Sequence, residues 1–446
     1  MNSDQFARVL YQGLGRTIVY ARSHDCSPFY TVILQACLYN PIYDRQTGVD
    51  RAPYLHELIA ATGAEPWFRA HILAALADPD DEMDRELLFD LALRFAQEGD
   101  GAARTTMLAR FLDNVSCGEI NGAYQIAELD DKASLRFVVE QIGAAMQRAV
   151  DFSECWISEH FLDDLEAAYS HEPEILNDAR IATFRQMVRR SPDEQRIYEQ
   201  EKAQRKELRT RLLDLTYTDV HQAVASKLLN LKDLWGWGQH TSDTELRRAA
   251  DDVLALTESN LQWRLLAIFD ERDFPYGYAS LLPLLDHPKD LVRFRAAHVL
   301  ARFRHPELRA RALQLLAAAD TLEYGLILLL GNYEAGDYAM LAALVQPMPD
   351  QNFEFRSQES EGQAGQLSDE NLHALVSRVH DLFVRYPAPE AAELLLLLYE
   401  SGPCDQCRDN IVADLLDLDA LPPRIAEECR FDANDQIRDL VEARAQ

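Results

Sequence analysis

The sequence predicts an all-α fold in which antiparallel helix pairs stack one on the next, and three observations support this prediction. Glycine and proline occur only 18 times each in 446 residues, which is below average usage. Apolar residues recur at helical spacing, and no valine- or threonine-rich alternating run indicates a strand. Hydrophobic residues make up 48% of the chain, which is enough for a core and excludes global disorder.

A chain of this length exceeds the usual limit of a single core, so we expect several domains or one extended stack. Three regions are expected: an N-terminal helical region over residues 1–175, a charged bridging segment over 176–218, and a repeat region over 219–446. In the first region, Gly63 is a predicted helix C-cap, because glycine tolerates the left-handed conformation. The acidic turn around Asp80–Glu86 suits a helix N-terminus.

The bridging segment is predicted to contain one very polar helix. Ser191 and Pro192 form a typical helix opening. Residues 199–207 contain almost no large apolar side chain, and Glu201 and Arg205 stand in the favourable i,i+4 order. A helix of this kind is solvated on most of its circumference, so we expect it to project from the fold or to bridge its two halves.

The stretch Ala279–Phe303 carries the clearest pattern in the repeat region. A leucine-rich helix containing Pro283 is expected first, then a turn at residues 286–288, then an amphipathic helix that opens at Leu291. This order resembles a HEAT repeat. The resemblance implies a right-handed α-solenoid, since such pairs must stack on neighbours to bury their apolar faces. It also implies that Asp286 and Arg293 form structural hydrogen bonds between repeats.

Two further segments complete the predicted repeat region. A partial match to the second HEAT helix lies at residues 432–443. Residues 347–369 are polar and lack helical periodicity, so a long mobile loop between helices is expected there, and this loop could contact a partner.

An arginine-rich tract within this region gives the first candidate binding site. Arginines and one lysine dominate residues 289–311 in an otherwise acidic protein. The candidate partner-binding residues are Arg293, Arg295, Arg302 and Arg304. They could form a positive surface that binds phosphate or an acidic partner segment. The alternative, which we favour, is that they pair with surrounding carboxylates.

Trp235 and Trp237 are the second candidate binding feature, and we expect them on a turn because glycines separate them. An exposed tryptophan can act as a recognition anchor. The alternative, which we favour, is that both rings fold back and fill the junction between helices.

Cys404 and Cys407 form a CxxC pair, but no second pair accompanies them, so no metal site is predicted. We expect these cysteines to open a helix, one turn apart. Scattered cysteines, no signal-like N-terminus and no apolar run long enough for a bilayer predict a cytoplasmic protein of bacterial type without membrane contact.

The formal charge of −30 argues against general binding to nucleic acid or anionic membranes and favours a basic partner, although it could serve solubility alone. No catalytic motif and no cofactor motif is found in the sequence. The predicted function is therefore a non-catalytic scaffold or adaptor for a protein partner, for example a basic toxin or a nucleic-acid-processing enzyme. The alternative is a nucleic-acid-directed protein, such as a HEAT-like DNA glycosylase, that uses the arginines of residues 293–311.

Overall fold

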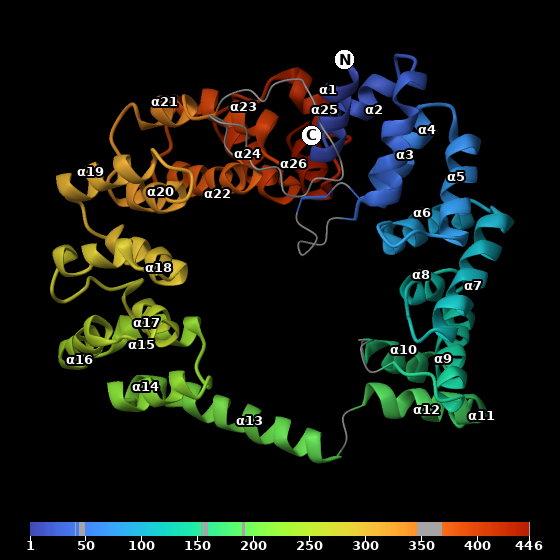
Figure 1. Cartoon of the computed structure of the whole chain (residues 1–446), viewed down its shortest axis with the longest axis horizontal. Helices are drawn as coiled ribbons and strands as arrows, with labels where there is room; N and C mark the ends of the chain where they lie inside the picture. Colours follow the sequence, from blue (N-terminus) through green and yellow to red (C-terminus); the bar gives the residue numbers. More distant parts are fainter. Residues whose placement is uncertain are drawn as a thin grey trace. The chain divides into compact units, whose positions relative to one another are not determined.

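The computed structural model describes residues 1–40, 42–43, 50–152, 155, 159–189, 192–345 and 368–445. Every regular element in these residues is a helix, so the all-α prediction is confirmed (Figure 1). The long loop expected over residues 347–369 lies outside the described residues, except that Ser368 caps the helix that begins at Asp369.

The chain forms two compact units. One contains Met1–Pro192 and Gly402–Gln446, and the other contains Asp193–Pro347 and Gly362–Ser401. We call them the terminal unit and the middle unit. The helices of the terminal unit are α1 (Ser3–Gln12), α2 (Arg16–Ala21), η1 (Ser27–Phe29), α3 (Tyr30–Tyr39), α4 (Ala52–Ala61), α5 (Glu65–Ala77), α6 (Arg85–Gln97), α7 (Gly101–Ser116), α8 (Ala123–Ala127), α9 (Asp131–Gln147), α10 (His160–Ala168), α11 (Pro173–Leu176), α12 (Ala179–Val188), α24 (Asp405–Asp417), α25 (Pro423–Cys429) and α26 (Asp435–Ala445).

The middle unit holds the remaining helices, which are α13 (Pro192–Thr210), η2 (Leu212–Asp214), α14 (Tyr217–Ala225), α15 (Leu231–His240), α16 (Asp243–Ala255), α17 (Ser259–Leu266), η3 (Ala267–Phe269), η4 (Tyr278–Ser280), η5 (Leu282–Asp286), α18 (Asp290–Leu300), α19 (Pro306–Leu315), α20 (Leu322–Gly331), α21 (Asp337–Ala342), α22 (Asp369–Arg385) and α23 (Ala391–Ser401). These two units do not coincide with the three expected regions, because residues 402–446 belong with the first helices of the chain.

The two ends of the chain meet within the terminal unit. Helix α25 packs on α2 (Figure 1). The amide of Ala433 donates a 2.9 Å hydrogen bond to the carbonyl oxygen of Gly13. Gly15 makes this contact possible, since a Cβ there would lie 2.0 Å from the carbonyl oxygen of Glu428. Sequence periodicity marks each helix as amphipathic but does not say which distant helix covers it.

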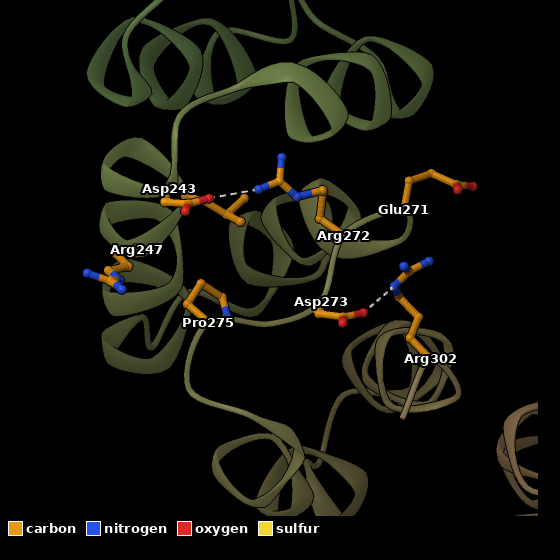
Figure 2. Close-up of a pocket in the computed structure, with 8 residues that line it drawn as sticks. Asp243, Arg247, Glu271, Arg272, Asp273, Pro275 and Arg302 are labelled. Carbon is orange, nitrogen blue, oxygen red and sulfur yellow. Dashed lines mark hydrogen bonds and ion pairs between the residues drawn. The ribbon is translucent and has the colours of Figure 1, made fainter. Parts of the chain in front are cut away.

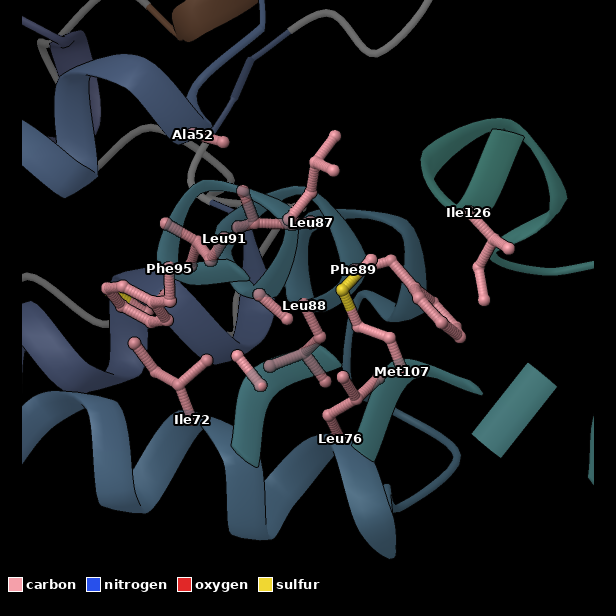
Figure 3. Packing of buried hydrophobic residues seen from close by; sticks show 14 of the residues in the cluster. Ala52, Ile72, Leu76, Leu87, Leu88, Phe89, Leu91, Phe95, Met107 and Ile126 are labelled. Carbon is pink, nitrogen blue, oxygen red and sulfur yellow. The ribbon is translucent and has the colours of Figure 1, made fainter. Parts of the chain in front are cut away.

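The core of the terminal unit consists of aliphatic and aromatic side chains from successive helices (Figure 3). Phe89 of α6 lies beside Met107 of α7 and Ile126 of α8 in this core, and all three are fully buried. Local signals set the helix ends as the sequence indicates. The carboxylate of Asp84 caps α6 through the amide of Leu87 at 2.9 Å, and Gly63 has a φ of 70° after α4.

In the middle unit, helices pack on one another in chain order, α17 on α18, α18 on α20 and α20 on α22. The HEAT-like stretch differs from the expectation in its first half. Residues expected as a leucine-rich α-helix form the 3₁₀ turns η4 and η5, whereas the second helix is present as α18. Pro283 lies in the first turn of η5 and lacks an amide donor, which favours a short turn over a long helix.

The predicted tryptophan turn is wrong, because Trp235 and Trp237 lie inside helix α15. The side chains of Asn230 and Asp233 form a capping box that starts this helix. Gly238 lies within this helix, and glycine is needed there because a Cβ would lie 2.0 Å from the carbonyl oxygen of Ile268. The glycines thus allow close packing of a helix and do not mark a loop.

The polar helix predicted between the two main regions is α13, and its described side chains from Glu194 to Glu207 are exposed. Within the described part of the chain, no helix has both the length and the apolar character needed to cross a bilayer.

Candidate functional site

The candidate site is centred on Asp270–Asp273, four consecutive charged residues that follow η3. This segment, together with α16 and Arg302, which follows α18, borders an open cavity of about 360 Å³ in the middle unit (Figure 2). The cavity is lined by Asp243, Leu246, Arg247, Glu271, Arg272, Asp273, Pro275 and Arg302. Small-molecule sites are lined mainly by apolar side chains, so this charged lining suits charged groups of a protein partner better.

Two ion pairs define the electrostatics of the cavity. Arg272 Nη2 lies 2.9 Å from Asp243 Oδ1, and Arg302 Nε lies 3.3 Å from Asp273 Oδ1 (Figure 2). Each guanidinium also donates to a main-chain carbonyl oxygen at 3.1 Å. The carboxylates are the exposed members, with 81% and 70% of the Asp243 and Asp273 side chains accessible against 31% for each arginine. The arginines therefore hold two carboxylates toward solvent.

Ion pairs in which the carboxylate is more exposed than the arginine also occur along the arginine-rich tract. The further pairs are Arg293 with Asp290 at 2.7 Å, Arg309 with Glu334 at 3.0 Å, and Arg311 with Asp286. In each of these pairs the carboxylate is more exposed than the guanidinium, although Arg309 also binds the buried Asp337. These arginines thus pair with surrounding carboxylates, as the favoured interpretation of the tract expects.

Arg304 differs from the other arginines that the sequence selects. Its side chain is exposed, and it forms no ion pair with any residue that the structure describes. It is the one member of the predicted set whose guanidinium is available to solvent without a carboxylate partner among the described residues.

Arg295 is buried and contacts the carboxylate of Asp270. Burial raises the pKa of Asp270 to about 6, and the guanidinium of Arg295 opposes this increase. The indole of Trp235 also favours the ionised carboxylate, although its buried Nε1 lacks a hydrogen bond of normal geometry. The structure thus brings Trp235 and Arg295, two predicted binding residues, to one interior carboxylate.

His298 lies one helical turn beyond Arg295 on α18. Burial lowers its pKa to about 3, and the positive charges of Arg378 and Arg295 act in the same direction. Its Nε2 is buried without a hydrogen-bond partner among the described residues. The ring is therefore neutral at physiological pH, and protonating it would place a third positive charge beside two guanidinium groups.

Trp237 fills the junction between helices, as the favoured interpretation of the tryptophan pair expects for both rings. It is fully buried, and its Nε1 donates to the carbonyl oxygen of Leu215 at 2.9 Å. Trp235 is only partly buried. Trp237 is therefore unsuited to act as an exposed recognition anchor.

Asp286 and Arg293, expected to hydrogen-bond between repeats, bind different partners. Asp286 pairs with Arg311 of α19, whereas Arg293 pairs with Asp290 on its own helix and donates to the hydroxyl of Tyr324 at 3.4 Å. The two side chains do not bond to each other. Asp286 therefore contacts α19, and Arg293 contacts α20 through Tyr324.

The cysteines of the CxxC pair open a helix, as expected. The thiol of Cys404 caps α24 by accepting a hydrogen bond from the amide of Cys407 at 3.4 Å. The adjacent Cys404 thiol and burial both raise the pKa of Cys407, which favours the neutral thiol.

Sequence reasoning missed the carboxylates that complete this site. Asp243, Asp270 and Asp273 pair with arginines that lie between 25 and 29 positions away. The only local signal is the run of four charged residues at 270–273 within an apolar context. Which arginine each carboxylate meets depends on helix packing.

Searches with the complete chain found no matching family model, no similar curated protein and no similar solved structure.

Proposed function

We propose that this chain is a non-catalytic, protein-binding scaffold that presents an ordered row of carboxylates to a basic partner. The binding surface runs from the cavity beside Asp270–Asp273 along the arginine-rich tract. A partner's lysine or arginine side chains would enter the cavity and meet Asp243, Glu271 and Asp273. We also propose that the stacked helices form a right-handed, HEAT-like solenoid, which would make this surface continuous.

One observation carries the proposal: in five arginine pairs of the middle unit, the arginine is partly covered and an exposed carboxylate faces solvent. A carboxylate fixed by a guanidinium loses less side-chain freedom when it binds a cation than a free one does. The chain's charge of −30 adds long-range attraction for a basic protein and accelerates encounter.

The greater exposure of the carboxylates in these pairs also distinguishes a basic protein partner from nucleic acid. A nucleic-acid-directed protein would need exposed guanidinium groups for phosphate contacts. Of the tract's cations, only Arg304 and Lys289 are exposed without an ion-pair partner among the described residues. The acidic outer row therefore supports a basic protein partner over DNA. The cytoplasmic location stays a prediction from the sequence.

Binding of a fluorescently labelled oligoarginine peptide, measured by anisotropy, tests this proposal. Asp243→Asn combined with Asp273→Asn removes both fixed carboxylates of the cavity. We expect affinity to fall by about tenfold, because each exposed charge pair contributes up to about 1 kcal/mol. The loss should shrink as salt is raised.

A matched control removes the same charge elsewhere. Asp113 and Asp417 are exposed and lie in the terminal unit, so Asp113→Asn with Asp417→Asn should leave oligoarginine binding almost unchanged. An equal loss in both double variants would mean that net charge alone attracts the peptide, and the proposed surface would be rejected. Tighter binding of single-stranded oligothymidylate than of oligoarginine would reject the basic-partner proposal itself.

A further inference from the structure

A second charged surface of the middle unit lies on α13 and has the opposite polarity. One face of this helix borders a groove of about 540 Å³. The groove is lined by Tyr198, Glu201, Lys202, Arg205, Lys206, Arg209 and Thr210. Four of these seven residues are cationic and one is acidic. This concentration of positive charge is unusual in a chain whose net charge is −30.

The helix itself explains why these cations form one stripe. Tyr198, Lys202, Arg205, Lys206 and Arg209 are spaced at i, i+4, i+7, i+8 and i+11, which places them on one side of an α-helix. At about 1.5 Å per residue the stripe is about 16 Å long. That length matches about five residues of an extended peptide, or about three turns of a partner helix.

The ion pair at the end of the stripe is reversed relative to those of the arginine-rich tract. Arg209 Nε lies 2.9 Å from Asp233 Oδ1, but here the arginine is 49% exposed and the carboxylate only 10%. The buried carboxylate fixes the guanidinium while leaving its other donors toward solvent. At this position the fold therefore presents positive charge.

The two lysines of the stripe are available for a ligand. Lys202 and Lys206 are exposed, and neither forms an ion pair with a described residue. Lys202 lies 5.7 Å from the ring centre of Tyr198, which is 41% exposed and provides an aromatic surface beside the charge. Arg205 is only weakly engaged, at 3.6 Å from Glu201.

We propose that this face of α13 binds an acidic segment of a protein partner. Charge complementarity decides the class of ligand, because the stripe offers four cations and a tyrosine to about five consecutive residues. Nucleic acid is less suitable, since its phosphates extend far beyond the stripe into the field of a chain with charge −30. This inference stands on α13 alone and does not depend on the proposed carboxylate surface.

Fluorescence anisotropy with a labelled oligoglutamate peptide tests the proposal on the full chain. Lys202→Glu with Lys206→Glu should weaken binding at least about tenfold, whereas Lys202→Gln with Lys206→Gln should have an intermediate effect. Both lysines are exposed on a helix, and glutamate and glutamine are good helix formers, so folding should be retained. Circular dichroism verifies this before binding is measured.

The control is Lys227→Glu with Lys232→Glu, which changes the net charge equally at two exposed lysines of the middle unit outside both proposed surfaces. Retained binding in this control, with loss in the α13 variant, supports the proposal. Equal loss in both, or no oligoglutamate binding by the unmodified chain, overturns it.

Stronger binding of oligothymidylate with the same number of charges would assign the face to nucleic acid. A dimer in sedimentation that the α13 variant abolishes would assign it to a second copy of the chain. Either result also overturns the proposal.

Discussion

The guanidinium of Arg51 and the carboxylate of Asp405 approach to 2.8 Å, although the two residues come from opposite ends of the sequence. Both side chains are almost completely buried, at 0% and 2% exposure. A second buried pair lies nearby, in which Arg408 Nη2 is 2.8 Å from Asp432 Oδ1. Asn434 links the two pairs, because its side-chain amide donates to the carbonyl oxygen of Asp405 at 3.0 Å and its main-chain amide donates to Asp432 Oδ1 at 3.0 Å. Charged groups thus fix how the two ends of the chain meet inside the terminal unit.

Removing one partner of the first pair should be strongly destabilising. Asp405→Ala leaves the Arg51 guanidinium buried without its carboxylate, which typically costs about 3–5 kcal/mol. Urea unfolding followed by circular dichroism measures this loss. In the same unit, Arg22 and Glu57 form an exposed pair at 2.9 Å, so Glu57→Ala should change stability by less than about 1 kcal/mol. Similar losses in the two variants would show that the buried pair does not hold the ends together.

The close approach of the two ends also predicts a large effect of one added methyl group. Gly15→Ala places a Cβ against the main chain of Glu428 and Phe431, neither of which can move aside as a flexible side chain could. Overpacking of this kind should cost about 1–3 kcal/mol of unfolding free energy. Gly101 is the matched control, because a Cβ there meets no atom within 4 Å and lies in the first turn of α7. Gly101→Ala should be neutral or slightly stabilising, and a comparable loss there would contradict the steric explanation.

The two tryptophans of α15 should differ in their contribution to stability. Trp237→Phe removes buried volume and leaves the carbonyl oxygen of Leu215 without its donor, which should cost about 2 kcal/mol. Trp235→Phe should cost less, since the Trp235 ring is partly exposed and its Nε1 makes no normal hydrogen bond. Urea unfolding of both variants gives the comparison. A larger loss from Trp235→Phe would reverse the assignment of Trp237 as the residue that fills the helix junction.

His298 should make the native protein less stable in acid. Its pKa is about 3 in the folded protein against 6.5 for the free side chain, so the neutral form is favoured by folding. The stability that this provides is present above pH 6.5 and is lost as the pH falls from about 6.5 toward 3. His298→Gln removes the titration, so the unmodified protein should lose about 2 kcal/mol relative to the variant between about pH 7 and pH 5.

Urea unfolding of both proteins across this pH range tests the His298 prediction. Asp270 has a raised pKa of about 6, so its own titration acts with the opposite sign: native stability falls as the pH rises from 3.8 to about 6. Asp270 is present in both proteins, so its effect largely cancels in their difference. Parallel stability curves for the two proteins would show that His298 is not held neutral by burial beside Arg295 and Arg378.

The sequence alone determined the class of this fold and many local boundaries. Helical periodicity, the cap signals around Asp84 and the left-handed Gly63 all follow from interactions within a few residues, which local sequence encodes. The exposed polar helix α13 is predictable for the same reason, because a segment without large apolar residues cannot bury a face. The misassigned tryptophan turn shows the limit. Gly238 is required by a contact with Ile268, and that contact does not exist until η3 packs on α15.

Tertiary structure decided what the arginines do and where the chain ends lie. The sequence shows that Arg295 and Arg302 are near each other, but only helix packing pairs Arg295 with the mostly buried Asp270 and Arg302 with the exposed Asp273. The pairing of Arg51 with Asp405 likewise depends on which amphipathic faces cover each other. Local periodicity gives each helix a buried side, whereas the identity of the residues opposite that side depends on contacts between distant parts of the chain.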